Sequence, residues 1–221
     1  AVWVFRAGGQ GLASLRSAAG RVREYPELLM SPRFWGYVLS TAFASGVFFA
    51  YLGGAPFVGT VLYNLTPSEL GLYFGATGLG YGAGNFLSGR YSTRVGTNRM
   101  IVYGNVAMAA GLIVQIGAVV TGLGGALGFF LPFLVVGLGN GMVLPNSNAG
   151  MLSVRPHLAG TAAGLGGAFM IGGGAALSAL AGAVLTPQTG AWPLLTIMAL
   201  SCLGSIVAIA LVIRRNKSLG L

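Results

Sequence analysis

The residues that could act on a ligand in this chain are uncharged amides set inside long apolar segments. Asn85, Asn105 and Gln115 each stand alone, whereas further amides gather around Pro145. An amide donates and accepts hydrogen bonds but does not carry a proton at ordinary pH. Glu69 is the only acidic residue after position 27. Because intramembrane carboxylates are the usual proton carriers, these segments predict hydrogen bonding to a ligand and provide no evident proton relay.

The strongest candidate binding group surrounds Pro145, which leaves a carbonyl of the preceding turn without its helical partner. Interhelical hydrogen bonding, worth on average about 0.6 kcal/mol in lipid, is the alternative interpretation of each amide. Aromatic side chains and Pro56 could complete a pocket wall, with packing against lipid as the alternative for each aromatic. The predicted substrate-binding residues are Phe48, Tyr51, Pro56, Tyr73, Asn140, Asn146, Asn148 and Phe169.

Other kinds of chemistry find little support in the sequence. Ser88 and His157 could be paired as an intramembrane protease, but no second motif accompanies them. The glycines form no phosphate-binding loop, and no cysteine and histidine spacing of a metal site occurs. The single cysteine, Cys202, lies in an apolar run and reads as a small buried hydrophobic residue. We therefore predict no enzymatic activity, no cofactor and no metal.

The composition predicts an all-α membrane protein. Hydrophobic residues make up 55% of the 221 residues and charged residues only 7%, whereas a soluble domain carries roughly a quarter charged residues. About 20 helical residues cross a hydrocarbon core of ~30 Å. The chain contains uncharged runs of that length, which predict six transmembrane helices at about 34–62, 70–88, 100–122, 127–152, 160–185 and 193–213.

The positions of the cations predict the orientation of these helices. Five of the twelve Lys and Arg residues lie in segment 1–33, three in 89–99, one at Arg155 and three in the tail 214–221; the other connections carry none. Cytoplasmic loops are the ones enriched in Lys and Arg. We therefore expect both termini in the cytoplasm. The net charge of +9 is explained by this topology, so nucleic acid is not an expected partner.

Local patterns add detail to this picture. Segment 1–33 predicts a cytoplasmic connection with a short amphipathic helix near residues 12–22, and the tail 214–221 is basic. Residues 66–69, Thr-Pro-Ser-Glu, predict a helix start with a capping box. A kink or break is expected at Pro56. Span 70–88 contains glycines four residues apart, which would let helices approach closely in lipid.

The basic loop 89–99 resembles the cytoplasmic loop signature of the major facilitator superfamily. The matching residues are Gly89, Arg94, Gly96 and Arg99, while Thr93 stands where the signature has an aspartate. This departure is similar to the degraded copy of the signature in the second half of such transporters. Within that superfamily the chain looks like the C-terminal half of a Bcr/CflA-type multidrug resistance transporter. The similarity rests on segments 31–37, 54–58, 65–74, 144–146 and 156–163.

This resemblance implies twelve helices in the whole protein, arranged as two six-helix halves that alternate access to a central cavity. It implies proton-driven export of a small hydrophobic or cationic substrate, an N-terminal half that carries the acidic residues, and a bacterial inner membrane. The sequence would then be a fragment or one half of a larger assembly. The alternative that we retain is a self-contained six-helix channel or an oligomeric membrane scaffold.

Overall fold

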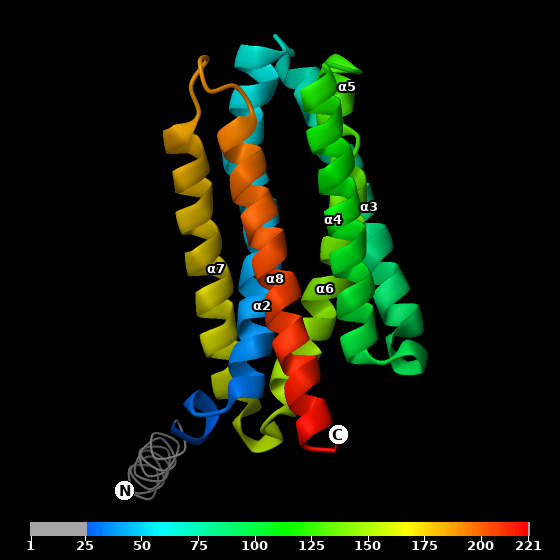
Figure 1. Cartoon of the computed structure of the whole chain (residues 1–221), viewed down its shortest axis with the longest axis vertical. Helices are drawn as coiled ribbons and strands as arrows, with labels where there is room; N and C mark the ends of the chain where they lie inside the picture. The colour runs from blue at the N-terminus through cyan, green and yellow to red at the C-terminus, as the bar shows by residue number, and fades with distance from the viewer. Residues whose placement is uncertain (1–25, 221) are drawn as a thin grey trace, which may run out of the picture.

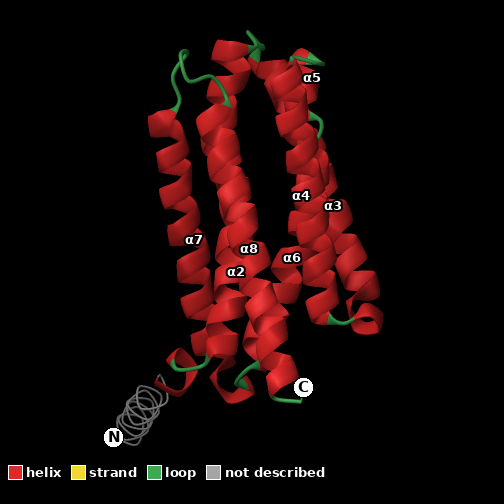
Figure 2. Cartoon of the chain, in the orientation of Figure 1, coloured by secondary structure: helices red, strands yellow, loops and turns green. Residues whose placement is uncertain are grey.

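The computed structural model of the protein describes residues 26–220 (Figure 1). The predicted amphipathic helix near residues 12–22 lies outside the described residues. Figure 2 shows helices and loops over the described part of the chain, with no strand there. The helices are α2 (Pro32–Phe57), a π-helical turn (Val58–Leu62), α3 (Pro67–Val95), α4 (Thr97–Thr121), α5 (Gly125–Phe130), α6 (Phe133–Ser153), a 3-10 turn (Pro156–Leu158), α7 (Ala159–Val184) and α8 (Trp192–Ser218).

Five helical segments are long and apolar enough to cross a membrane: Pro32–Leu62, Thr97–Thr121, Gly125–Ser153, Pro156–Val184 and Trp192–Ser218. This confirms the predicted all-α membrane fold. Helix α3 has 29 residues but is not among the five segments, because its many glycines lower its mean hydropathy. It packs against α6 and lies beside α4 (Figure 1). A sixth crossing, through α3, therefore stays a prediction.

Two helices organise the bundle. Helix α2 packs against α6, α7 and α8, and α6 packs in turn against α3 and α4. Helices α7 and α3 consequently lie on opposite flanks of the bundle in Figure 1. The α3–α4 turn, the α6–α7 turn and the C-terminus lie at the same end of the bundle (Figure 1). These are the segments that carry the cations of the described chain, apart from Arg33 at the start of α2.

The start of α3 forms as its sequence predicts. The backbone N–H of Glu69 donates to Thr66 Oγ1 at 3.3 Å, and the backbone N–H of Thr66 donates to a Glu69 carboxylate oxygen at 2.8 Å. Pro67 occupies the first turn, where it has no helical N–H to lose. This capping box confirms the interpretation of residues 66–69.

The predicted loop 89–99 is wrong in extent. Helix α3 continues to Val95 and α4 starts at Thr97, so Gly96 alone connects them. Gly96 has φ +94°, a conformation that residues with a Cβ rarely adopt. The cations at Arg90 and Arg94 are exposed along the last turns of α3, where they extend into water without ending the helix.

The winding of the helices changes near two prolines. The predicted break at Pro56 is wrong, because α2 continues to Phe57 and then passes into a π-helical turn at Val58, while a kink at Pro56 stays a prediction. The predicted span 127–152 agrees with the apolar segment Gly125–Ser153, within which the helix is interrupted: α5 ends at Phe130 and α6 starts at Phe133, after Pro132. The predicted basic tail is largely helical, since α8 extends to Ser218.

Glycine permits the close contact between α3 and α6. A Cβ at Gly80 or Gly84 would overlap the backbone carbonyl of Leu134 or Leu138 on α6. By contrast, nothing lies within 4 Å of a Cβ built at Gly78 on the same helix. Only one face of α3 therefore depends on the absence of a side chain.

We expect Gly84→Ala to destabilise the bundle by about 1–3 kcal/mol, because the added methyl must push α3 away from α6. The matched Gly78→Ala should be neutral or stabilising by about 0.5–1 kcal/mol, since it only improves helix propensity. Unfolding of the purified protein in mixed micelles measures both effects. Equal effects of the two substitutions would contradict this packing.

Candidate functional site

The predicted asparagines of α6 form hydrogen bonds between helices. Asn140 Nδ2 donates to the carbonyl oxygen of Ala44 on α2 at 2.7 Å. Asn146 Nδ2 donates to Ser88 Oγ on α3 at 2.7 Å and to the Met142 carbonyl at 2.8 Å. Both side chains are buried, whereas Asn148 is partly exposed. The structure thus supports the interhelical role for two of the three amides, and their role in binding a substrate stays a prediction.

A cluster of serines adds further hydrogen bonds between the helices. Ser40 Oγ lies 3.3 Å from Ser147 Oγ and 3.3 Å from Ser205 Oγ, which joins α2, α6 and α8. The sequence shows Ser147 beside two asparagines, but nothing local marks Ser40 as its partner, because the two are 107 residues apart, and Ser205 is 165 residues from Ser40. Asn140 Oδ1 is buried and has no hydrogen-bond partner among the described residues.

The predicted aromatic residues fall into two groups. Tyr51 is buried and stacks on Phe133 with ring centroids 3.6 Å apart, and Tyr73 stacks on Phe130 at 4.7 Å. Phe48 lies in a near-parallel arrangement with Tyr81 at 6.2 Å. All these pairs join α2 or α3 to a neighbouring helix or segment.

Phe169 and Pro56 lie apart from that aromatic cluster. Phe169 on α7 is exposed and meets Trp35 edge to face at 5.2 Å. Pro56 is exposed on α2, and its carbonyl accepts a hydrogen bond from Thr60 Oγ1 at 2.8 Å. The structure therefore does not bring all eight predicted substrate residues into one pocket.

At the end of the bundle that carries the cations, a contact links α2 to the start of α4. Tyr37 Oη donates to Asn98 Oδ1 at 2.7 Å. A cavity of about 410 Å³ lies beside this bond, lined by both residues and by Arg33, Arg99, Ser153 and Asn216, among others. Of the four predicted loop-motif residues, Gly96 makes the turn, and Gly89, Arg94 and Arg99 are exposed. Tyr37 is an aromatic candidate for a pocket wall from the sequence, but its bond to Asn98 is not predictable there, because the two residues are 61 positions apart.

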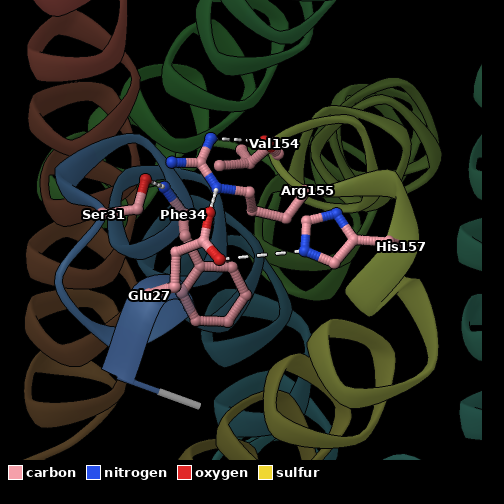
Figure 3. A network of polar contacts seen from close by, with 6 residues as sticks. All are labelled: Glu27, Ser31, Phe34, Val154, Arg155 and His157. Carbon is pink, nitrogen blue, oxygen red and sulfur yellow. Dashed lines mark hydrogen bonds and ion pairs between the residues drawn. The ribbon is translucent and has the colours of Figure 1, made fainter. Parts of the chain in front are cut away.

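A second contact at this end holds the segment before α2 against the α6–α7 turn (Figure 3). Arg155 Nε donates to a Glu27 carboxylate oxygen at 2.7 Å, and His157 Nε2 lies 3.8 Å from the other oxygen. These groups are half exposed, so the ion pairs contribute modestly to stability. His157 therefore faces Glu27, while Ser88 Oγ interacts with Asn146 and Ser92.

These groups offer hydrogen bonding and aromatic contact. Helices α2 to α8 contain no aspartate, and their only glutamate is Glu69 in the first turn of α3. In residues 26–220, no three His, Cys, Asp or Glu side chains are grouped so as to hold a metal ion. The described site can orient a ligand, but its helix interiors carry no carboxylate to exchange a proton.

Comparison with known proteins identifies the kind of chain that this is. A family model described as Major Facilitator Superfamily matches residues 2–179 and also residues 55–219. The chain is 27% identical over 171 residues to a Bacillus subtilis (strain 168) protein named "Uncharacterized MFS-type transporter YdgK". That alignment covers 76% of this chain but 40% of the relative, so the chain spans less than half of it. No solved structure matches the chain.

The Asn146–Ser88 bond can be measured with a double-mutant cycle. Asn146→Ala, Ser88→Ala and the double variant should show a coupling energy of about 0.6 kcal/mol, the average for side-chain hydrogen bonds in membranes. Unfolding in mixed micelles is the readout. The pair Asn148 and Ser88 provides the control and should show no coupling. A coupling of zero for Asn146 and Ser88 would contradict the observed bond.

Proposed function

We propose that this chain, which belongs to the Major Facilitator Superfamily, forms one six-helix half of a proton-driven exporter of small hydrophobic or cationic drugs, as in Bcr/CflA-type transporters. Membrane transport follows from the family and from the MFS-type transporter relative. The observation that carries the more specific proposal is a pair of uncovered glycine-rich helix faces on α3 and α7.

On α3 the packed glycines and the open glycines lie on opposite faces, whereas on α7 the open glycines lie on several sides of the helix. On α7, Gly166 and Gly174 contact Met151 and Phe49. Nothing lies within 4 Å of a Cβ built at the open-face glycines, which are Gly71, Gly75, Gly78 and Gly82 on α3 and Gly160, Gly164, Gly167, Gly172 and Gly173 on α7. Small residues let helices approach closely in lipid. We infer that a second helical half docks on these faces and slides along them.

The distribution of acidic residues supports different roles for the two halves, one carrying the proton and the other contacting the substrate. Transporters of this architecture bind substrate and coupling ion near the membrane midplane, at the interface of their repeats. Because the long helices of this chain carry no carboxylate in their interiors, the proton-carrying acid would lie on the other half. This half would supply aromatic and amide contacts to the substrate. Aromatic faces attract organic cations.

The predicted site on this half comprises Phe48, Tyr51, Pro56, Tyr73, Asn140, Asn146, Asn148 and Phe169. The cluster around Tyr51 and Phe133 would form its outer wall, and the amides of α6 its polar centre. We place the protein in the bacterial inner membrane, with both ends of the chain in the cytoplasm, because the cations of the described chain lie at one end of the bundle.

The same open faces leave a second candidate function. Two copies of this chain could pair through the glycine faces of α3 and α7, which would make a self-contained oligomeric channel or scaffold. The two functions differ in what the faces contact. A cysteine at Gly78 would crosslink to another copy in the oligomer and to a different six-helix half in the exporter.

Uptake into everted membrane vesicles tests the proposed function in the full-length protein. A pH gradient should drive accumulation of several chemically unrelated hydrophobic cations. We expect Asn146→Ala and Pro56→Ala each to lower the initial rate at least threefold, by removing a polar contact and by altering the outer end of α2. Pro187→Ala, in the α7–α8 connection, is the matched control and should leave the rate unchanged.

Two results would contradict the proposal. Accumulation that is indifferent to the pH gradient would remove proton coupling. Unchanged efflux of every drug in both Asn146→Ala and Pro56→Ala would remove these residues from the substrate site.

A further inference from the structure

The groove between α4 and α8 contains a buried polar residue that no group of residues 26–220 satisfies. The groove has a volume of about 420 Å³, and its wall is almost entirely apolar, with Val102, Ala109 and Ile113 from α4 and Ile206, Ala210 and Ile213 from α8. Asn105 also lines it and is only 2% exposed. Neither Asn105 Nδ2 nor Asn105 Oδ1 has a hydrogen-bond partner among the described residues.

An unsatisfied amide in such a place needs an explanation. Burying an amide without a hydrogen bond is costly. The buried asparagines of α6 avoid part of this cost because each donates from Nδ2 to a neighbouring helix, although Asn140 Oδ1 has no partner among the described residues; at Asn105 neither polar atom has one. A ligand in the groove that presents a hydrogen-bonding group at this depth would supply the missing partner.

The groove has the length of one lipid leaflet. From Val102 to Ile113 the helix rises by about 17 Å, and half of a hydrocarbon core is about 15 Å thick. The groove is therefore long enough for one acyl chain that lies along the bundle surface.

Beyond one end of the groove, a cation lies on each of the two helix faces that line it. On α4, Arg99 precedes Val102, Val106, Ala109 and Ile113 at spacings of three and four residues, and on α8, Lys217 follows Ile213 by four residues. Residues at these spacings share a helix face. Both cations are exposed, and neither has a carboxylate partner within residues 26–220.

We propose that this groove binds an anionic phospholipid. One acyl chain occupies the apolar groove, the phosphate lies between Arg99 and Lys217, and an ester carbonyl accepts a hydrogen bond from Asn105 Nδ2. Asn105 lies about 9 Å deeper along α4 than Arg99, which is the order in which a phospholipid presents phosphate, ester and chain. Apolar contact, charge and the unsatisfied amide thus point to the same ligand.

Native mass spectrometry of the purified full-length protein tests this site. The probes are phosphatidylglycerol and phosphatidylcholine with the same palmitoyl and oleoyl chains. The wild type should retain phosphatidylglycerol preferentially. Lys217→Gln should lower retention of phosphatidylglycerol about fivefold and leave phosphatidylcholine unchanged, since one cation near an anionic surface contributes about 1 kcal/mol. Arg90→Gln, a cation on α3 away from the groove, is the matched control and should change neither.

Two further variants test the amide and the groove. Asn105→Leu should lower retention of both lipids about threefold, because it removes one hydrogen bond in a membrane setting. Ala110→Phe fills the groove and should abolish selective retention, whereas Ala163→Phe on the exposed surface of α7 should not. If Ala110→Phe does not fold, Asn105→Leu and Lys217→Gln decide the matter.

The proposal is overturned if Asn105→Leu and Lys217→Gln retain phosphatidylglycerol as the wild type does. It is equally overturned if the wild type retains neither lipid, which would indicate that a protein helix covers the groove in the full-length molecule.

Discussion

In the hydrocarbon of a membrane, a charge or an unpaired backbone group finds no polar partner. This constraint explains where the described chain places its charged and polar groups. The backbone of the long helices is hydrogen-bonded within each helix, as a lipid environment requires. Cations of the described chain lie at one end of the bundle, and Glu27 meets Arg155 and His157 there. Among the polar side chains that remain inside, Asn140 and Asn146 each bond to a neighbouring helix.

The same constraint makes glycine the residue that determines which helix faces meet. Lipid is as apolar as a leucine side chain, so helix association in a membrane depends on close packing. Gly80 and Gly84 place α3 directly against backbone carbonyls of α6. Other glycines of α3 and α7 are open: no atom of the described chain lies within 4 Å of a Cβ built there. On α3, the packed glycines therefore mark the side that faces the bundle interior. The open glycines mark the side through which the bundle would meet a partner.

Features that depend on neighbouring residues were predictable from the sequence. The capping box at Thr66 and Glu69 involves four consecutive residues. The long apolar runs predict the five segments that are long and apolar enough to cross a membrane. The arginines after residue 88 predict an end of α3 that is too early, because an arginine side chain reaches water from a helix that continues, here to Val95. The gap between α5 and α6 was missed because the uncharged run continues through Pro132.

Contacts between distant residues were the part that the sequence could not supply. Tyr51 and Tyr73 were candidates for a pocket wall, but their stacking partners, Phe133 and Phe130, come from segments whose register against α2 and α3 only the packing determines. For the amides, the sequence shows that Asn105 and Asn140 are both set in apolar runs. Only the structure shows that Asn140 donates to Ala44, whereas Asn105 has no partner in the described part of the chain.

The most direct test of this account is the sidedness of single cysteines in intact bacterial cells, in a background with Cys202→Ala. Cysteines at Ser68 and Gln188 should react with a membrane-impermeant maleimide added outside. Cysteines at Thr93 and His157 should react only after the membrane is opened. These four positions are exposed at opposite ends of the bundle. Labelling of Thr93→Cys from outside, or failure to label Ser68→Cys there, would show that α3 does not cross the membrane as this account requires.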